Sequence, residues 1–199
     1  IDNFRYQYNY CFYSYYGSNY DIQRNQFTAY YGNFFAYMNS YDWNNTTSIV
    51  ANNMYMGDNA SYAIYGYYWS HVNFYINYLY GKGSYLCYWY YMTDMDVRNN
   101  IFYYSGPNYS IYTYNPTFTN WDYNDYVTTG GNLAYITGSV YANLSALKGW
   151  NANYNQNSFE EDPQWVDNEK DHHVKATFPE MYGPYVGLDL DFDSADRCR

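Results

Sequence analysis

The chain has 199 residues, enough for one domain with a hydrophobic core, and 35 of them are tyrosine. Leu, Ile and Val, on which compact cores normally rely, are scarce. The net charge of −10 opposes binding to a phosphate backbone or to anionic lipid, so we expect no nucleic-acid partner. No apolar run is long enough to span a bilayer, so we expect no membrane span either.

A short motif recurs along the first 126 residues: an apolar residue, two variable residues, an asparagine, one variable residue and a bulky apolar residue. An Asn side chain can bond the backbone of a turn and an amide above it, and it tolerates left-handed backbone angles. We therefore predict a structural ladder of asparagines. Its members are Asn25, Asn52, Asn77, Asn100 and Asn124.

A second repeated element, an apolar residue followed directly by tyrosine, accompanies each copy of this motif. The tyrosines of this element are Tyr13, Tyr37, Tyr65, Tyr88, Tyr112 and Tyr135. Two residues later a second tyrosine follows in most copies, at Tyr15, Tyr67, Tyr90 and Tyr114. Since alternate residues of a strand point to one side, we predict that these tyrosines form an aromatic surface along one outer face.

A period of about 24 residues, built from two short extended runs, predicts a stack of coils, because one coil cannot bury its apolar side alone. We predict an all-β parallel β-solenoid of about six coils over residues 1–139, closed by a capping tail with a short helix over 140–199. The chain lacks the leucine ladders of leucine-rich repeats and the 3.6-residue periodicity of helical repeats, so we exclude both classes. The predicted inward residues are Ile22, Ile49, Phe74, Val97 and Trp121, with Ile64, Cys87 and Ile111.

The C-terminal third carries motifs that resemble a known family. They are NWDYNDY at 120–126, TTGGNLAY, YANLSALKGW, EEDPQWVD at 160–167 and DHHVKATFPE at 171–180. They resemble the C-terminal part of right-handed parallel β-helix repeat proteins of the pectate-lyase-like superfamily, in their secreted bacterial form. Phe178 departs from the family, which usually has Ser before the proline. The resemblance implies right-handed winding and an extracellular or cell-surface location.

Enzymes of that family need a carboxylate cluster beside a basic residue, or two carboxyls flanking the scissile bond. The best candidate is the run of Asp94, Asp96 and Arg98, in which alternate residues of one strand would face the same side. A solvated strand edge explains the same run, and we favour that interpretation. Asp122 and Asp125 flank Asn124, where Asp commonly bonds backbone amides. We therefore assign no catalytic residue.

Candidate metal ligands occur only in the tail. His172 and His173 would need a third ligand such as Asp167 or Glu169, and a packing role is the simpler explanation. A second set alternates like the start of a calcium loop, but it lacks the glycine and the closing glutamate of that loop. That set is Asp189, Asp191 and Asp193. We predict no cofactor apart from weak Ca²⁺ binding there.

Two functional hypotheses follow. The first is an extracellular structural or adhesive protein, such as the self-assembling subunit of a filament or surface layer, which associates through Tyr-rich faces and open coil ends. The alternative is a polysaccharide-binding or polysaccharide-degrading β-helix, with tyrosine rings that stack on sugars. The expected partners are accordingly a second copy of the chain, or a cell surface or polysaccharide. An enzyme would need carboxylates converging on a groove, and an assembly protein would not.

Overall fold

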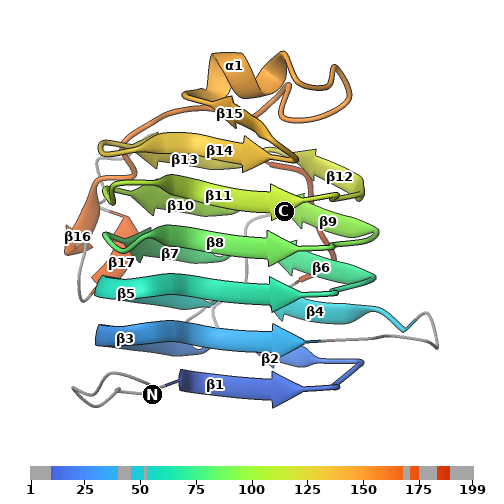
Figure 1. Cartoon of the computed structure of the whole chain (residues 1–199), viewed down its shortest axis with the longest axis vertical. Coiled ribbons are helices and arrows are strands. Elements are labelled where there is room, and N and C mark those ends of the chain that lie inside the picture. The colour runs from blue at the N-terminus through green and yellow to red at the C-terminus, as the bar shows by residue number, and fades with distance from the viewer. Residues whose placement is uncertain (1–9, 40–45, 52, 168–170, 175–182, 189–199) are drawn as a thin grey trace.

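The computed structural model describes residues 10–39, 46–51, 53–167, 171–174 and 183–188. These residues form a parallel β-solenoid, with one short helix at the end of the stack (Figure 1). The chain crosses the front of the stack in Figure 1 from left to right, returns along the back and rises one level with each turn, so the winding is right-handed. The predicted fold class is therefore confirmed.

The solenoid has about four turns, not the six coils predicted. The prediction counted one coil for every copy of the repeated segment.

Two parallel sheets build the walls. The five-stranded sheet contains β2 (Asp21–Gln23), β4 (Ser48–Ala51), β6 (Val72–Tyr75), β9 (Met95–Arg98) and β12 (Phe118–Asp122). The ten-stranded sheet bends around the other two faces. One of these faces contains β7 (Tyr78–Gly81), β10 (Ile101–Tyr104) and β13 (Asp125–Thr128). The other contains β1 (Tyr10–Tyr15), β8 (Tyr85–Tyr90), β11 (Tyr109–Tyr114) and β14 (Asn132–Ile136). Two long strands, β3 (Gln26–Asn39) and β5 (Met54–Tyr67), span both faces. Its last strand, β15 (Ser139–Tyr141), is antiparallel to β14.

Glycines occupy the corner at which the later coils have two strands in place of one long strand. The turns between β7 and β8, β10 and β11, and β13 and β14 all contain glycine. A Cβ on Gly106 would collide with the carbonyl oxygen of Gly83 in the coil below, and one on Gly131 would collide with that of Asn108. Only glycine allows the turns of successive coils to approach so closely.

The core runs along the stack between the sheets. Six of the eight predicted inward residues are buried: Phe74, Val97, Trp121, Ile64, Cys87 and Ile111. Ile22 packs against this core and is partly buried.

The prediction for Ile49 is wrong by one position. Val50 pairs with Ile22 on one side and Phe74 on the other, so Val50 points inward and is buried. Ile49 packs instead in a separate cluster on the outer side. The sequence permits both registers, because each of the two adjacent apolar residues precedes one of two adjacent asparagines by three positions.

The corner between the two sheets carries the asparagine ladder. Its hydrogen-bonded members are Asn25, Asn53, Asn77, Asn100 and Asn124. Asn53 therefore holds the position predicted for Asn52, which lies outside the described residues. From Asn53 onward, each Oδ1 accepts two bonds from the preceding coil. Asn100, for example, accepts from the Nδ2 of Asn77 at 3.1 Å and from the backbone N of Asn77 at 2.9 Å. The Nδ2 of Asn100 in turn donates to the backbone carbonyl oxygen of Phe74 at 2.9 Å.

The tight corner comes from the residue before each asparagine, not from the asparagine itself. Arg24, Ile76, Asn99 and Tyr123 all have φ between 55° and 61°. A left-handed backbone is costly for such residues, above all for a β-branched one such as Ile76. The hydrogen bonds made by the side-chain amide of the following asparagine hold this strained turn in place.

The tail closes the C-terminal end of the stack. Helix α1 (Leu144–Lys148) is N-capped by Asn143 and buries Leu144 and Leu147 on the core. The segment after it imitates one more coil, because Phe159 bridges Asp125 in parallel fashion. The ladder ends where the backbone N of Asn124 donates to the Oγ of Ser158 at 3.1 Å. Residue 140, the first residue of the predicted cap, lies within β15.

Beyond the cap, the tail returns along the outside of the solenoid. The antiparallel pair β16 (Trp165–Asp167) and β17 (Asp171–Val174) places Trp165 on Tyr80 and Tyr103, at the outer side of β7 and β10. Further on, Val186 and Leu188 pack in the outer cluster with Ile76. The tail therefore covers parts of two of the three outer faces.

The ladder predicts a steep dependence of stability on its central members. Asn100→Ala orphans two buried N–H groups of Asn77, each of which costs about 1–3 kcal/mol. We expect the free energy of unfolding, measured by urea denaturation, to fall by about 2–6 kcal/mol. Asn25→Ala is the matched control, since Asn25 is the first member of the ladder and is only partly buried. Equal losses in the two variants would contradict the ladder as a cooperative element.

The cap predicts an unusual pH dependence. Asp125 is 1% exposed, and burial raises the pKa of its carboxyl to about 7, although Oδ1 accepts a bond from the backbone N of Glu161. Because the folded chain binds this proton more tightly than the unfolded chain, the contribution is present below pH 3.8 and is lost as pH rises toward 7. Each unit of pKa is worth about 1.4 kcal/mol.

We therefore expect Asp125→Asn to remove this loss of stability between pH 4 and 7, as measured by denaturation at a series of pH values. Asp162→Asn removes one exposed carboxyl from the same tail and serves as the control for net charge. If both variants keep the slope of the unmodified protein, the buried carboxyl is not its source.

Candidate functional site

The most regular feature of the surface is a grid of tyrosines, which we call the tyrosine face. It covers the outer side of β8, β11, β14 and the C-terminal half of β5, where parallel pairing places equivalent residues above one another. The grid has three columns. They are Tyr62, Tyr85 and Tyr109; Tyr65, Tyr88, Tyr112 and Tyr135; and Tyr67, Tyr90 and Tyr114.

The rings of the middle column are stacked almost parallel. The ring centroids are 4.9 Å apart between Tyr65 and Tyr88, 4.6 Å between Tyr88 and Tyr112, and 4.7 Å between Tyr112 and Tyr135. The angles between the ring planes are 8°, 2° and 4°. Within the column each ring face is covered by the next ring, so the edges and hydroxyls are what remain for an external partner.

Buried apolar side chains lie beneath this grid, on the inner side of the same strands. The residues between the outward tyrosines of β8 are Leu86, Cys87 and Trp89, and all three are fully buried. The outward positions of the three columns hold only tyrosine and, on β14, Asn132. The tyrosine face is therefore a rigid surface whose grid positions carry no charge.

Burial and neighbouring rings oppose ionisation of three tyrosines of this face, Tyr62, Tyr88 and Tyr112. The pKa of Tyr88 is raised well above its usual value, first by burial and then by the neighbouring hydroxyls of Tyr112 and Tyr65. Burial likewise raises the pKa of Tyr112 and of Tyr62. Ionisation of one phenol would place its charge beside the stacked neighbours, which opposes it.

The predicted aromatic residues occupy the expected face wherever their side chains are described. Tyr13 and Tyr15 lie on β1 and are 54% and 52% exposed. Tyr37 pairs in register between Tyr13 and Tyr65, but its side chain lies outside the described residues.

The prediction missed the column of Tyr62, Tyr85 and Tyr109. Each of these precedes a predicted tyrosine by three positions, not two, because two consecutive residues, such as Leu86 and Cys87, are both buried. This break in the alternation hides the column from a search for period two. Repetition of tyrosine at the same position of successive coils is the signal that identifies it.

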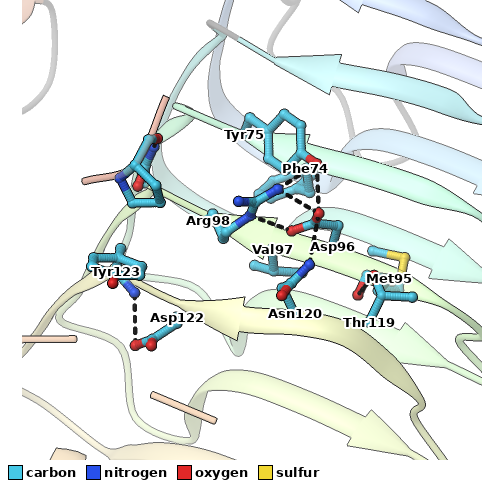
Figure 2. A network of polar contacts seen from close by, with 12 residues as sticks. Phe74, Tyr75, Met95, Asp96, Val97, Arg98, Thr119, Asn120, Asp122 and Tyr123 are labelled. Atoms are coloured by element: carbon cyan, nitrogen blue, oxygen red, sulfur yellow. Dashed lines mark hydrogen bonds and ion pairs between the residues drawn. The ribbon is translucent and has the colours of Figure 1, made fainter. Parts of the chain in front are cut away.

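The strongest catalytic candidate forms a closed polar network on the outer side of the five-stranded sheet (Figure 2). Arg98 donates to Asp96 through Nε at 2.6 Å and Nη2 at 2.7 Å. Asp96 also accepts from the hydroxyl of Tyr75 at 2.7 Å and from the Nδ2 of Asn120 at 3.0 Å. Asp96 is only 7% exposed, so its carboxylate is occupied by these donors and is not directed at a substrate.

Asp94 does not share a face with Asp96, which overturns that part of the prediction. Strand β9 begins only at Met95, and Asp94 lies in the preceding turn with φ of 52°. Its Oδ2 lies 3.6 Å from the Nδ1 of His71. The two carboxylates therefore belong to different contacts.

The remaining sequence candidates have structural partners or lie outside the described residues. Asp122 accepts bonds from the backbone N of Tyr123 and Asn157, as predicted for a turn aspartate. Asp189, Asp191 and Asp193 lie outside the described residues, as does Glu169 and the side chain of His172. Within the described part of the chain, no group of three or more His, Cys, Asp or Glu side chains is arranged to hold a metal ion.

Comparisons with protein-family models, with curated proteins and with solved structures found no match for this chain. Among the helices of the described residues, none combines the length and the hydropathy that crossing a membrane requires. The parallel strands and their stacking are consistent with a parallel β-helix.

The tyrosine face predicts a delayed alkaline titration. In the folded chain Tyr88 and Tyr112 hold their protons above the ordinary pKa of 10.0, so their contribution to stability is fully present below that pH and is lost as pH rises further. We expect the absorbance of phenolate to appear at higher pH in the native protein than in the protein unfolded in urea. Coincident titration curves would show that the stacked arrangement does not shift these groups.

Proposed function

We propose that this protein is an extracellular structural or adhesive solenoid whose copies associate through the tyrosine face. The observation that carries the proposal is the uncharged aromatic grid on a face that the described tail leaves uncovered, while the same tail packs on the other two faces. Extended exposed aromatic surfaces mark interaction sites, and Tyr and Trp supply large rigid contact area.

A second copy of the chain fits this face better than other partners do. Its own tyrosine face repeats with the same coil spacing, about 4.8 Å, so hydroxyls and ring edges of two copies can match over many coils. The chain carries a net charge of −10, and two copies therefore repel each other except where an uncharged surface lets them approach. The cap covers the C-terminal end of the stack, so we place the association on this face and not on that end.

The stacked geometry weighs against sugar stacking as the main use of the grid. A sugar ring packs against an aromatic face, whereas the column rings cover one another's faces. Edges and hydroxyls favour contact with another array of the same kind. The Asp96–Arg98 network offers no open carboxylate pair that would support a hydrolase or lyase.

The test is sedimentation over a range of protein concentrations, together with electron microscopy. We expect concentration-dependent association that strengthens with salt, because salt screens the repulsion between the acidic chains. Tyr112→Glu places a charge in the centre of the face and should weaken association at least tenfold, about 1.4 kcal/mol or more. Ser145→Glu adds the same charge on the exposed side of α1 and is the matched control.

Thermal melts of both variants separate lost association from lost folding. The proposal fails if the unmodified protein stays monomeric at every concentration and salt level, or if Tyr112→Glu associates as tightly as Ser145→Glu. Dispersed monomers that bind or cleave an acidic polysaccharide would favour the alternative function.

A further inference from the structure

The middle column of the tyrosine face has a geometry suited to covalent chemistry. Its rings lie 4.6–4.9 Å apart with nearly parallel planes. Parallel in-register strands give each side chain the same starting point, so the hydroxyls and the carbons ortho to them lie on the same side of the column.

We infer that this column is a site of oxidative cross-linking, in which neighbouring tyrosines of successive coils become joined as dityrosine. The co-reactant is a one-electron oxidant, such as a peroxidase acting with hydrogen peroxide. Tyr88–Tyr112 is the primary pair, since it has the shortest distance and the smallest angle of the column. This inference goes beyond the proposed assembly, because the bond forms within one chain.

The reaction balances with that oxidant. Each of two phenols loses one electron and one proton, which gives two phenoxyl radicals. The radicals join through a new C–C bond between their ortho carbons, and the hydrogen on each of these carbons then moves to the phenol oxygen to restore the aromatic rings. Overall the protein loses two hydrogen atoms, and one hydrogen peroxide is reduced to two waters.

The side chains around this column are less accessible or less well placed for coupling. The other easily oxidised side chains beneath it, Cys87, Trp89 and Met92, are fully buried, and burial raises the pKa of the Cys87 thiol far above its usual value. The tyrosines of the middle column, by contrast, are partly exposed. The pair of Tyr80 and Tyr103 is less suited, because its rings are tilted by 56° and pack against Trp165.

The experiment treats the dilute, monomeric protein with peroxidase and hydrogen peroxide, then digests it with trypsin. Cleavage after Lys82, Arg98 and Lys148 places Tyr88 in the peptide 83–98 and Tyr112 in the peptide 99–148. We expect a cross-linked species with the summed mass of these two peptides less two hydrogens, and fragmentation should place the bond between Tyr88 and Tyr112. The oxidised protein should remain monomeric and should unfold at a higher temperature.

Two matched variants test the assignment. Tyr88→Phe keeps the ring but lacks the phenol, so the Tyr88–Tyr112 bond should be lost, and Tyr103→Phe should retain it. The inference is overturned if the native chain gives no such bond, if bonds form only between chains, or if the urea-unfolded chain gives the same pair in equal yield. Failure of self-association would leave these outcomes unchanged, so this test and that of the proposed function are independent.

Discussion

The structure depends on one constraint: parallel coils stacked in register about 4.8 Å apart place each residue type against the residue at the same position of the next coil. Only side chains that tolerate such neighbours can be repeated. Like charges at this separation repel by about 3 kcal/mol at an effective dielectric constant of 20. Asp96 illustrates the rule, because Asn73 and Asn120 lie beside it in the neighbouring coils and no second carboxylate does. This explains why the solenoid body is so poor in charge.

Two kinds of self-matching side chain meet the constraint, each in a different environment. Asparagine both donates and accepts, so a buried column of amides satisfies itself along the stack and needs a hydroxyl, that of Ser158, only where it ends. Tyrosine stacks through its ring and keeps its hydroxyl in water, which suits an outer face. The cap therefore terminates a polar column as well as an apolar core.

The sequence was sufficient to predict the fold class, because the repeat of about 24 residues and the recurring Asn and Tyr are both visible in it. It failed where the period is ambiguous. The adjacent pairs Ile49–Val50 and Asn52–Asn53 permit two registers, and only the pairing with Phe74 selects one. The column of Tyr62 was missed because consecutive buried residues interrupt the alternation. The position of Asp94 could not be predicted, since it depends on a turn whose φ angle no residue type specifies.

The same periodicity shapes what association through the tyrosine face would produce. A grid that repeats with every coil looks nearly the same after a shift of one coil, so a second copy could dock in several staggered registers with similar contacts. A staggered contact leaves part of each face uncovered, and this part can accept a further copy. Contacts of this kind extend into filaments or layers, whereas a closed dimer requires a single register. A structural role therefore follows more directly from a repeating grid than from an isolated aromatic patch.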